Sequence, residues 1–97
     1  MSNLSHALDG WSLPRWQPDL SVRLVDGEAV IYDRQGGLIH QLNYTASIVW
    51  RQCDGNSTIT DIVQQIAHEF DVELEVARQD VLTILGQLHQ LHLLKFG

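Results

Sequence analysis

Apolar and polar residues alternate with a period of two over residues 21–42, which predicts β-strands. The segment SVRLV is followed by Asp26-Gly27 and then by EAVIYD, so a tight hairpin is expected between two strands. A second turn at 34–37 ends in Gly36-Gly37 and leads into LIHQL at 38–42. These three short strands predict an antiparallel meander.

After Asn43 the apolar period changes to about 3.6, which indicates a helix. Asn43 is a suitable N-cap, and the helix is expected to end at Asp54-Gly55 because glycine enters the left-handed region easily. Its apolar face comprises Ala46, Val49, Trp50 and Cys53.

Two further helices are expected. One begins at Thr60 as its cap and buries Ile62, Val63, Ile66, Ala67 and Phe70. The last runs from about Leu74 to Leu91, with an apolar set wider than one core face requires, and HLLKF follows as a short extended tail. The fold class is therefore α+β, a winged-helix-like βββααα domain over residues 18–97, preceded by an irregular arm at 1–17 that contains Trp11 and Trp16.

Size and composition limit the class of protein. Ninety-seven residues make one domain, and such a chain buries only about 60–65% of its unfolded surface. It contains no apolar run of the roughly 20 residues that span a bilayer and no signal-peptide pattern. The single cysteine excludes an intrachain disulfide. A protein of the reducing cytoplasm, away from membranes, is expected.

The formal net charge is −6, and the acidic residues concentrate in the second half of the chain. From Asp54 onward the chain has seven acidic residues, and its only basic residues there are Arg78 and Lys95. Many winged-helix domains bind DNA, but a helix that enters the major groove presents basic or amide side chains. The last two helices carry only Arg78 as a basic residue, so nucleic acid is not an expected partner.

Motifs for catalysis are absent from the sequence. It has no phosphate-binding loop, and Gly36-Gly37 has the chemistry of a turn. Cys53 falls on an apolar helix face, where cysteine is a small inert hydrophobe. His89 and His92, with His68 from another helix, form at most a weak metal pattern because H-E-x-x-H is missing. We therefore expect no enzyme, no metal and no cofactor.

The order of several short motifs resembles the PqqD-like family, the small peptide-binding domains also called RiPP recognition elements. The resemblance covers about residues 18–95. It is carried by Leu42-Asn43, Thr45-Ala46, Val49-Trp50, Asp54-Gly55, Thr58-Ile59, Asp61-Ile62-Val63 and Asp80-Val81. The chain departs from the pattern at Leu91-His92-Leu93-Leu94, where family members often have Gly-Leu-Leu. The arm resembles variants encoded beside proteins related to HPr kinase.

The resemblance implies a site and two partners. In this family, the leader segment of a precursor peptide adds as a strand beside the third strand, under the C-terminal helix. Carried over, the edge is Leu38, Ile39, His40, Gln41 and Leu42, and the helical wall is Arg78, Val81, Leu82 and Leu85. Strand alternation puts Leu38, His40 and Leu42 on one face. Core packing is favoured for Leu42, Val81 and Leu85; contact is favoured for Ile39, His40, Arg78 and Leu82. The second partner is a modifying enzyme, of radical-SAM or kinase-related type.

Three hypotheses follow for function. The leading one is a non-catalytic adaptor that captures a leader peptide by strand addition and presents it to the modifying enzyme. The second is a winged-helix nucleic-acid binder, which the charge disfavours. The third is a structural module that forms a homodimer through the same edge strand or through the arm.

Overall fold

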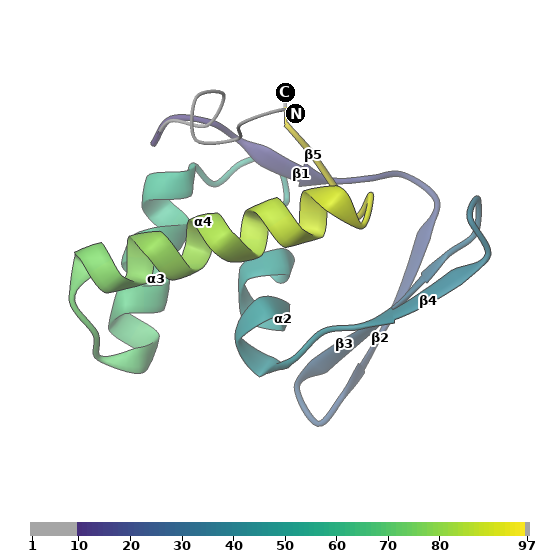
Figure 1. Cartoon of the computed structure of the whole chain (residues 1–97), viewed down its shortest axis with the longest axis horizontal. Coiled ribbons are helices and arrows are strands. Elements are labelled where there is room, and N and C mark those ends of the chain that lie inside the picture. Colours follow the sequence, from purple (N-terminus) through teal and green to yellow (C-terminus); the bar gives the residue numbers. More distant parts are fainter. Residues whose placement is uncertain (1–9, 97) are drawn as a thin grey trace.

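The computed structural model describes residues 10–96, and residues 1–9 of the expected arm lie outside the described part. Figure 1 shows a sheet at one end of the molecule and helices at the other. The elements in chain order are β1 (Pro14–Trp16), β2 (Leu20–Val25), β3 (Glu28–Asp33), β4 (Leu38–Gln41), α2 (Tyr44–Arg51), α3 (Ile59–Phe70), α4 (Leu74–Gln90) and β5 (Leu94–Phe96). The predicted meander followed by three helices is confirmed.

The main sheet has the strand order β2-β3-β4, and both pairings are antiparallel. Asp26 and Gly27 form the two-residue turn, both with positive φ (53° and 81°), as a hairpin of this length prefers. The second turn is held by the Asp33 carboxylate, which accepts hydrogen bonds from the backbone N–H of Gln35 and Gly36. The sequence therefore encodes both turns locally.

The arm is not irregular where the structure describes its end. Pro14–Trp16 forms β1 and pairs antiparallel with β5, which is the segment expected to be a free extended tail. The Trp16 indole N–H donates to the Trp50 carbonyl at 2.7 Å, and the two rings lie 5.5 Å apart. Because the two strands are only three residues long and about 80 positions apart, no local pattern predicts their pairing.

Helix α2 begins as expected, because the Asn43 side chain accepts the Ala46 N–H at 2.8 Å. Buried Ser47 ties this helix to the sheet. Its hydroxyl accepts the Ala29 N–H at 2.8 Å and lies 3.2 Å from the Leu42 carbonyl, so it is inserted where β3 and β4 would otherwise bond each other. The chain thereby turns from strand to helix without an unsatisfied buried N–H.

Two helix boundaries differ from the expectation. Helix α2 ends at Arg51, and Gly55 takes its left-handed φ of 85° in the following loop, where its N–H donates to the Pro14 carbonyl. Helix α3 begins at Ile59 and is capped by Thr58, not Thr60, because Thr58 and Asp61 form a reciprocal capping box. The α3 error is a choice between two nearby threonines, whereas α2 ends before the glycine, with Gln52 as its C-cap.

Helix α4 ends with His92 in the position that glycine usually takes. His92 has a φ of 61°, its N–H bonds the His89 carbonyl, and the Leu93 N–H bonds the Leu88 carbonyl. These two bonds form a Schellman motif, and the motif's customary apolar contact is available because Leu88 and Leu93 are both buried. The departure from Gly-Leu-Leu therefore leaves the exit from the helix intact.

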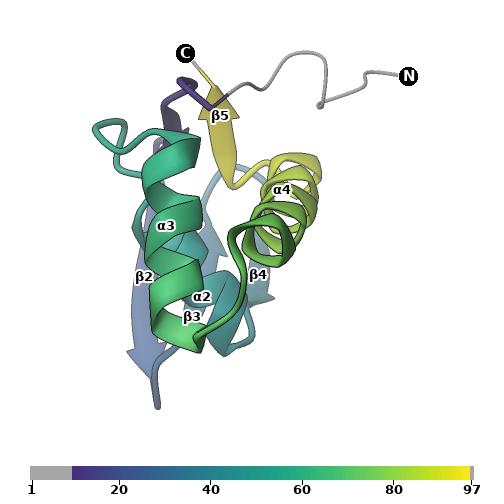
Figure 2. The same cartoon turned by 90° about the vertical axis from the view of Figure 1, so that its left-hand side faces the viewer.

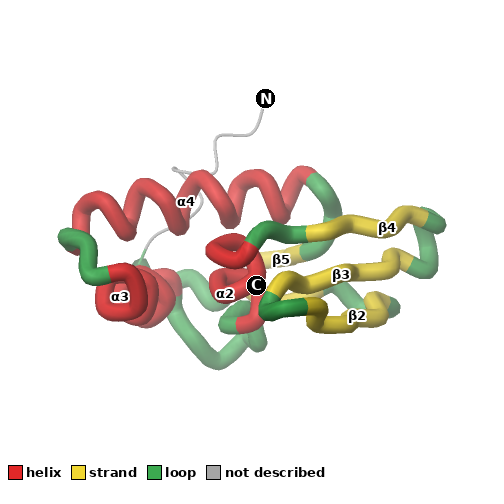
Figure 3. The backbone as a smooth tube through the Cα atoms, turned by 90° about the horizontal axis from the view of Figure 1, so that it is seen from below, coloured by secondary structure: helices red, strands yellow, loops and turns green. Residues whose placement is uncertain are grey.

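The three helices cover the sheet unevenly. Figures 2 and 3 both place α4 on the β4 side of the sheet and β2 on the far side. One core joins the inner face of β3 to all three helices; its members include Ala29, Ile31, Leu42, Val49, Trp50, Ile62, Ile66, Val81, Leu85, Leu93 and Leu94. The uneven cover leaves the two sheet edges in different surroundings. Within residues 10–96, no helix is long and apolar enough to cross a membrane.

Candidate functional site

Strand β4 presents an open backbone edge. The Leu42 N–H donates to the Ala29 carbonyl at 2.9 Å, which sets the phase of the antiparallel ladder. Hydrogen-bonded and non-bonded pairs alternate, so His40 and Leu38 bond to β3 while the N–H and C=O of Ile39 and Gln41 point outward. The described chain places no further strand beside them. An extended peptide can therefore bond this edge.

The side chains of β4 lie as the alternation predicts. His40 stands opposite buried Ile31 on the helix side, whereas Ile39 stands opposite Tyr32 on the outer face. Ile39 is 71% exposed and Leu38 57% exposed, while Leu42 is buried. A large apolar side chain on an open edge is costly in water, so Ile39 and Leu38 are the contacts that an added strand would cover.

The α4 residues that the resemblance places in the wall divide into two sets, as the sequence analysis favoured. Val81 and Leu85 are fully buried and belong to the core. Leu82 is half-buried and packs against that core, and Arg78, one turn earlier, is exposed. Leu82 and Arg78 lie on one helix face at a spacing of four. Of the nine residues predicted for the site, Leu42, Val81 and Leu85 are buried in the core.

His40 has an unusual environment for an edge residue. Its Nε2 is buried and has no hydrogen-bond partner, although the side chain as a whole is only half-buried. An unpaired buried polar atom costs free energy that a partner would recover. Because this atom is buried, an incoming strand would first meet the exposed part of the His40 side chain.

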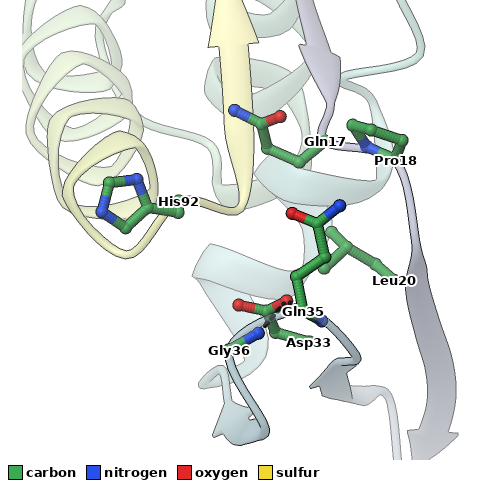
Figure 4. Close-up of a pocket in the computed structure, with 7 residues that line it drawn as sticks. All are labelled: Gln17, Pro18, Leu20, Asp33, Gln35, Gly36 and His92. Carbon is green, nitrogen blue, oxygen red and sulfur yellow. Dashed lines mark hydrogen bonds between the residues drawn. The ribbon is translucent and has the colours of Figure 1, made fainter.

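A hollow of about 380 Å³ with a mixed polar and apolar lining lies at the Leu38 end of β4, and sequence reasoning missed it. In Figure 4, side chains from the β1–β2 link, the β3–β4 turn and the corner after α4 surround it. The lining residues are Gln17, Pro18, Leu20, Asp33, Gln35, Gly36 and His92. The feature that marks this corner is the positive φ of His92, which is a property of the folded chain and cannot be read from the sequence.

Cys53 lies outside this region and is not a nucleophile at neutral pH. It is buried, and its Sγ contacts the Val49 carbonyl at 3.3 Å. Burial, and secondarily the Asp54 charge, raises the pKa of the thiol from 9.0 to about 12. Within the described chain, no group of three or more His, Cys, Asp and Glu side chains could hold a metal ion.

The raised pKa predicts slow alkylation of Cys53. Because the thiolate is the reactive form, iodoacetamide at mildly alkaline pH should modify the folded protein at least about a hundredfold more slowly than the denatured protein. Mass spectrometry of quenched samples measures both rates. Since the unfolded thiol loses its proton first, this group also lowers stability as the pH rises above 9.0. Similar rates in both states would show that the thiol is accessible.

The fold and the open edge together define a small winged-helix-like domain with a strand-accepting sheet. A family model described as Coenzyme PQQ synthesis protein D (PqqD) matches residues 28–94. The chain therefore belongs to the PqqD family, as the sequence resemblance indicated. No curated protein matches it.

Three solved structures share the fold. "TbiB1 in Complex with the TbiA(beta) Leader Peptide" has a TM-score of 0.77 and 22% identity, covering 84% of this chain and 94% of that one. "Lasso peptide synthetase B1 complexed with the leader peptide" has a TM-score of 0.76 and 25% identity, covering 86% and 98%. The PqqD truncation of Methylobacterium extorquens PqqCD, described as a functional, stand-alone RiPP recognition element, has a TM-score of 0.73 and 22% identity, covering 91% and 94%.

Proposed function

We propose that this protein binds the leader segment of a ribosomally made precursor peptide as an added strand on β4. The observation that carries the proposal is the outward-facing backbone of Ile39 and Gln41 on the side of the sheet where α4 lies. Two solved relatives of the same fold are described as leader-peptide complexes, which supports the proposal.

The chemistry of the edge suggests how affinity and selectivity divide. Backbone hydrogen bonds to Ile39 and Gln41 are available to any extended peptide. Selectivity then depends on side chains: Ile39 and Leu38 offer apolar contact, half-buried His40 lies on the helix side of the strand, and exposed Arg78 can pair with an acidic leader residue. Leu82 contributes apolar surface on the helix.

The modification itself belongs, in this proposal, to a partner enzyme in the cytoplasm, where precursor peptides are synthesised. The adaptor then has two contacts, one with the leader and one with the enzyme. The candidate types of enzyme are radical-SAM and kinase-related.

Titration of isotope-labelled protein with synthetic leader peptides from precursor genes beside its own gene tests the site. Backbone amide shifts should concentrate at 38–42 and along α4 near Arg78 and Leu82. A scrambled peptide of the same composition serves as the control. Saturable shifts confined to other surfaces would refute the site, and the absence of binding by every neighbouring leader would refute the function. A titration with duplex DNA at low salt examines the nucleic-acid hypothesis in the same way.

A further inference from the structure

The sheet has a second open edge, on β2. The Arg34 N–H donates to the Asp19 carbonyl at 3.3 Å, which sets the phase of the β2–β3 ladder. The bonded pairs are then Ser21/Tyr32, Arg23/Val30 and Val25/Glu28, and the alternate residues are not bonded across the ladder. The backbone groups of Leu20, Val22 and Leu24 therefore point away from the sheet, and the described chain provides no strand beyond them.

This edge also exposes apolar side chains on the inner face of the sheet, the face whose β3 residues lie in the core. Val22 and Leu24 stand opposite Ile31 and Ala29, which are both 0% exposed, yet each is itself 45% exposed. The reason is the uneven helical cover, which reaches β3 and β4 and stops short of β2 (Figures 2 and 3). Beside them is a mainly apolar hollow of about 280 Å³, lined by Trp16, Gln17, Asp19, Leu20, Val22 and Trp50.

The usual protections of a free edge are missing from β2. Proteins protect such edges with lysines, prolines, bulges or inward-pointing charges. Strand β2 pairs with β3 over six consecutive residues without a bulge, and its single charge, Arg23, lies on the outer face. The edge is therefore suited to stable pairing with a strand from another chain.

We propose that two copies of this chain pair antiparallel through β2. In the register centred on Val22, Val22 stands opposite the second copy's Val22, and Leu20 stands opposite its Leu24. All three outward-facing residues of each copy then find an outward-facing counterpart. The register is two-fold symmetric, as a closed homodimer requires.

Neighbouring registers are less suitable. A shift in one direction puts Pro18, which has no N–H, opposite the second copy's Leu24. A shift in the other direction puts Arg23 opposite the second copy's Arg23, a like-charge pair. The two copies each carry a net charge of −6 and repel each other overall, but residues 20–25 contain no acid, so the paired strands add no carboxylate repulsion at the seam.

This pairing joins two sheets into one and leaves both β4 edges outermost. The homodimer would hold two peptide-accepting edges at opposite ends of a continuous sheet. It differs in this respect from a dimer through β4, which would occlude the edge assigned to the leader peptide.

Sedimentation equilibrium over a wide concentration series tests the association. The wild type should pass from monomer to dimer with rising concentration, and V22K should stay monomeric because it places two lysines together at the symmetry axis. The matched control is I39K, an equivalent change on the other edge, which should dimerise as the wild type does. A wild type that is monomeric throughout, or an I39K variant that alone loses dimerisation, would overturn the proposal.

Disulfide trapping tests the register and does not depend on V22K folding. Bonded antiparallel pairs have Cα atoms about 5.5 Å apart, within the range for a disulfide, so mild oxidation should link V22C to a second copy. The control is L24C, whose counterpart is Leu20 and whose two thiols lie far apart. V22C should cross-link at least about tenfold faster than L24C. Equal rates, or a faster L24C, would contradict the register, and buried Cys53 adds no competing thiol.

Discussion

Replacement of Ile39 by proline is expected to weaken leader-peptide binding by at least about tenfold, because it removes a backbone donor from the β4 edge. The Ile39 N–H points away from β3, so proline removes no hydrogen bond within the sheet. Fluorescence anisotropy with a labelled leader measures the affinity, and an amide spectrum of the free protein verifies the fold.

The matched control for this variant is Ile39→Ala. Alanine removes the exposed side chain and keeps the N–H, so the difference between the two variants reports the backbone contribution alone. Equal affinities for the proline and alanine variants would show that no strand is added at this edge. In the homodimer test, I39P should associate as the wild type does, because β2 is unchanged.

Replacement of Leu85 by alanine is expected to lower the free energy of unfolding by about 2–5 kcal/mol, because the side chain is fully buried in the core beneath α4. A loss of this size is a large part of the total stability of a small domain. Thermal or denaturant unfolding followed by circular dichroism measures it.

Leu82→Ala, on the same helix, serves as the control because Leu82 is half-buried. Leu82→Ala should lower the free energy of unfolding less than Leu85→Ala does. For a given loss of stability, Leu82→Ala should also reduce the affinity for the peptide more. If Leu85→Ala left the unfolding free energy unchanged and reduced only the affinity, Leu85 would be a direct peptide contact, and its burial would have to be relieved on binding.

Most of the fold could be predicted because its signals are local. The Asp26-Gly27 turn, the Asn43 cap and the change of period after residue 43 each depend on neighbouring residues only, and each is confirmed. The missed cap of α3 was also local: Asp61 follows Thr58 at the capping-box spacing, whereas Val63 holds that position relative to Thr60, so the sequence already favoured Thr58.

The surroundings of the proposed site were predicted less completely than the fold, because they depend on how distant elements pack together. The sequence placed Val81, Leu82 and Leu85 on one wall and favoured the core for Val81 and Leu85, and their burial in the structure agrees with that division. The unpaired His40 Nε2 and the hollow beside His92 had no signal in the sequence, since both depend on elements that meet only in the folded chain.

By itself, the sequence determined the order of strands and helices, their turns and caps, and the family, because these follow from short-range patterns and their spacing. The tertiary structure decided the β1–β5 pairing and how far the helices cover the sheet. The physical reason is that three helices joined by short loops cannot cover every strand. Strand β4 is left beside α4 as an edge open to a peptide, and β2 is left with Val22 and Leu24 uncovered on the far side.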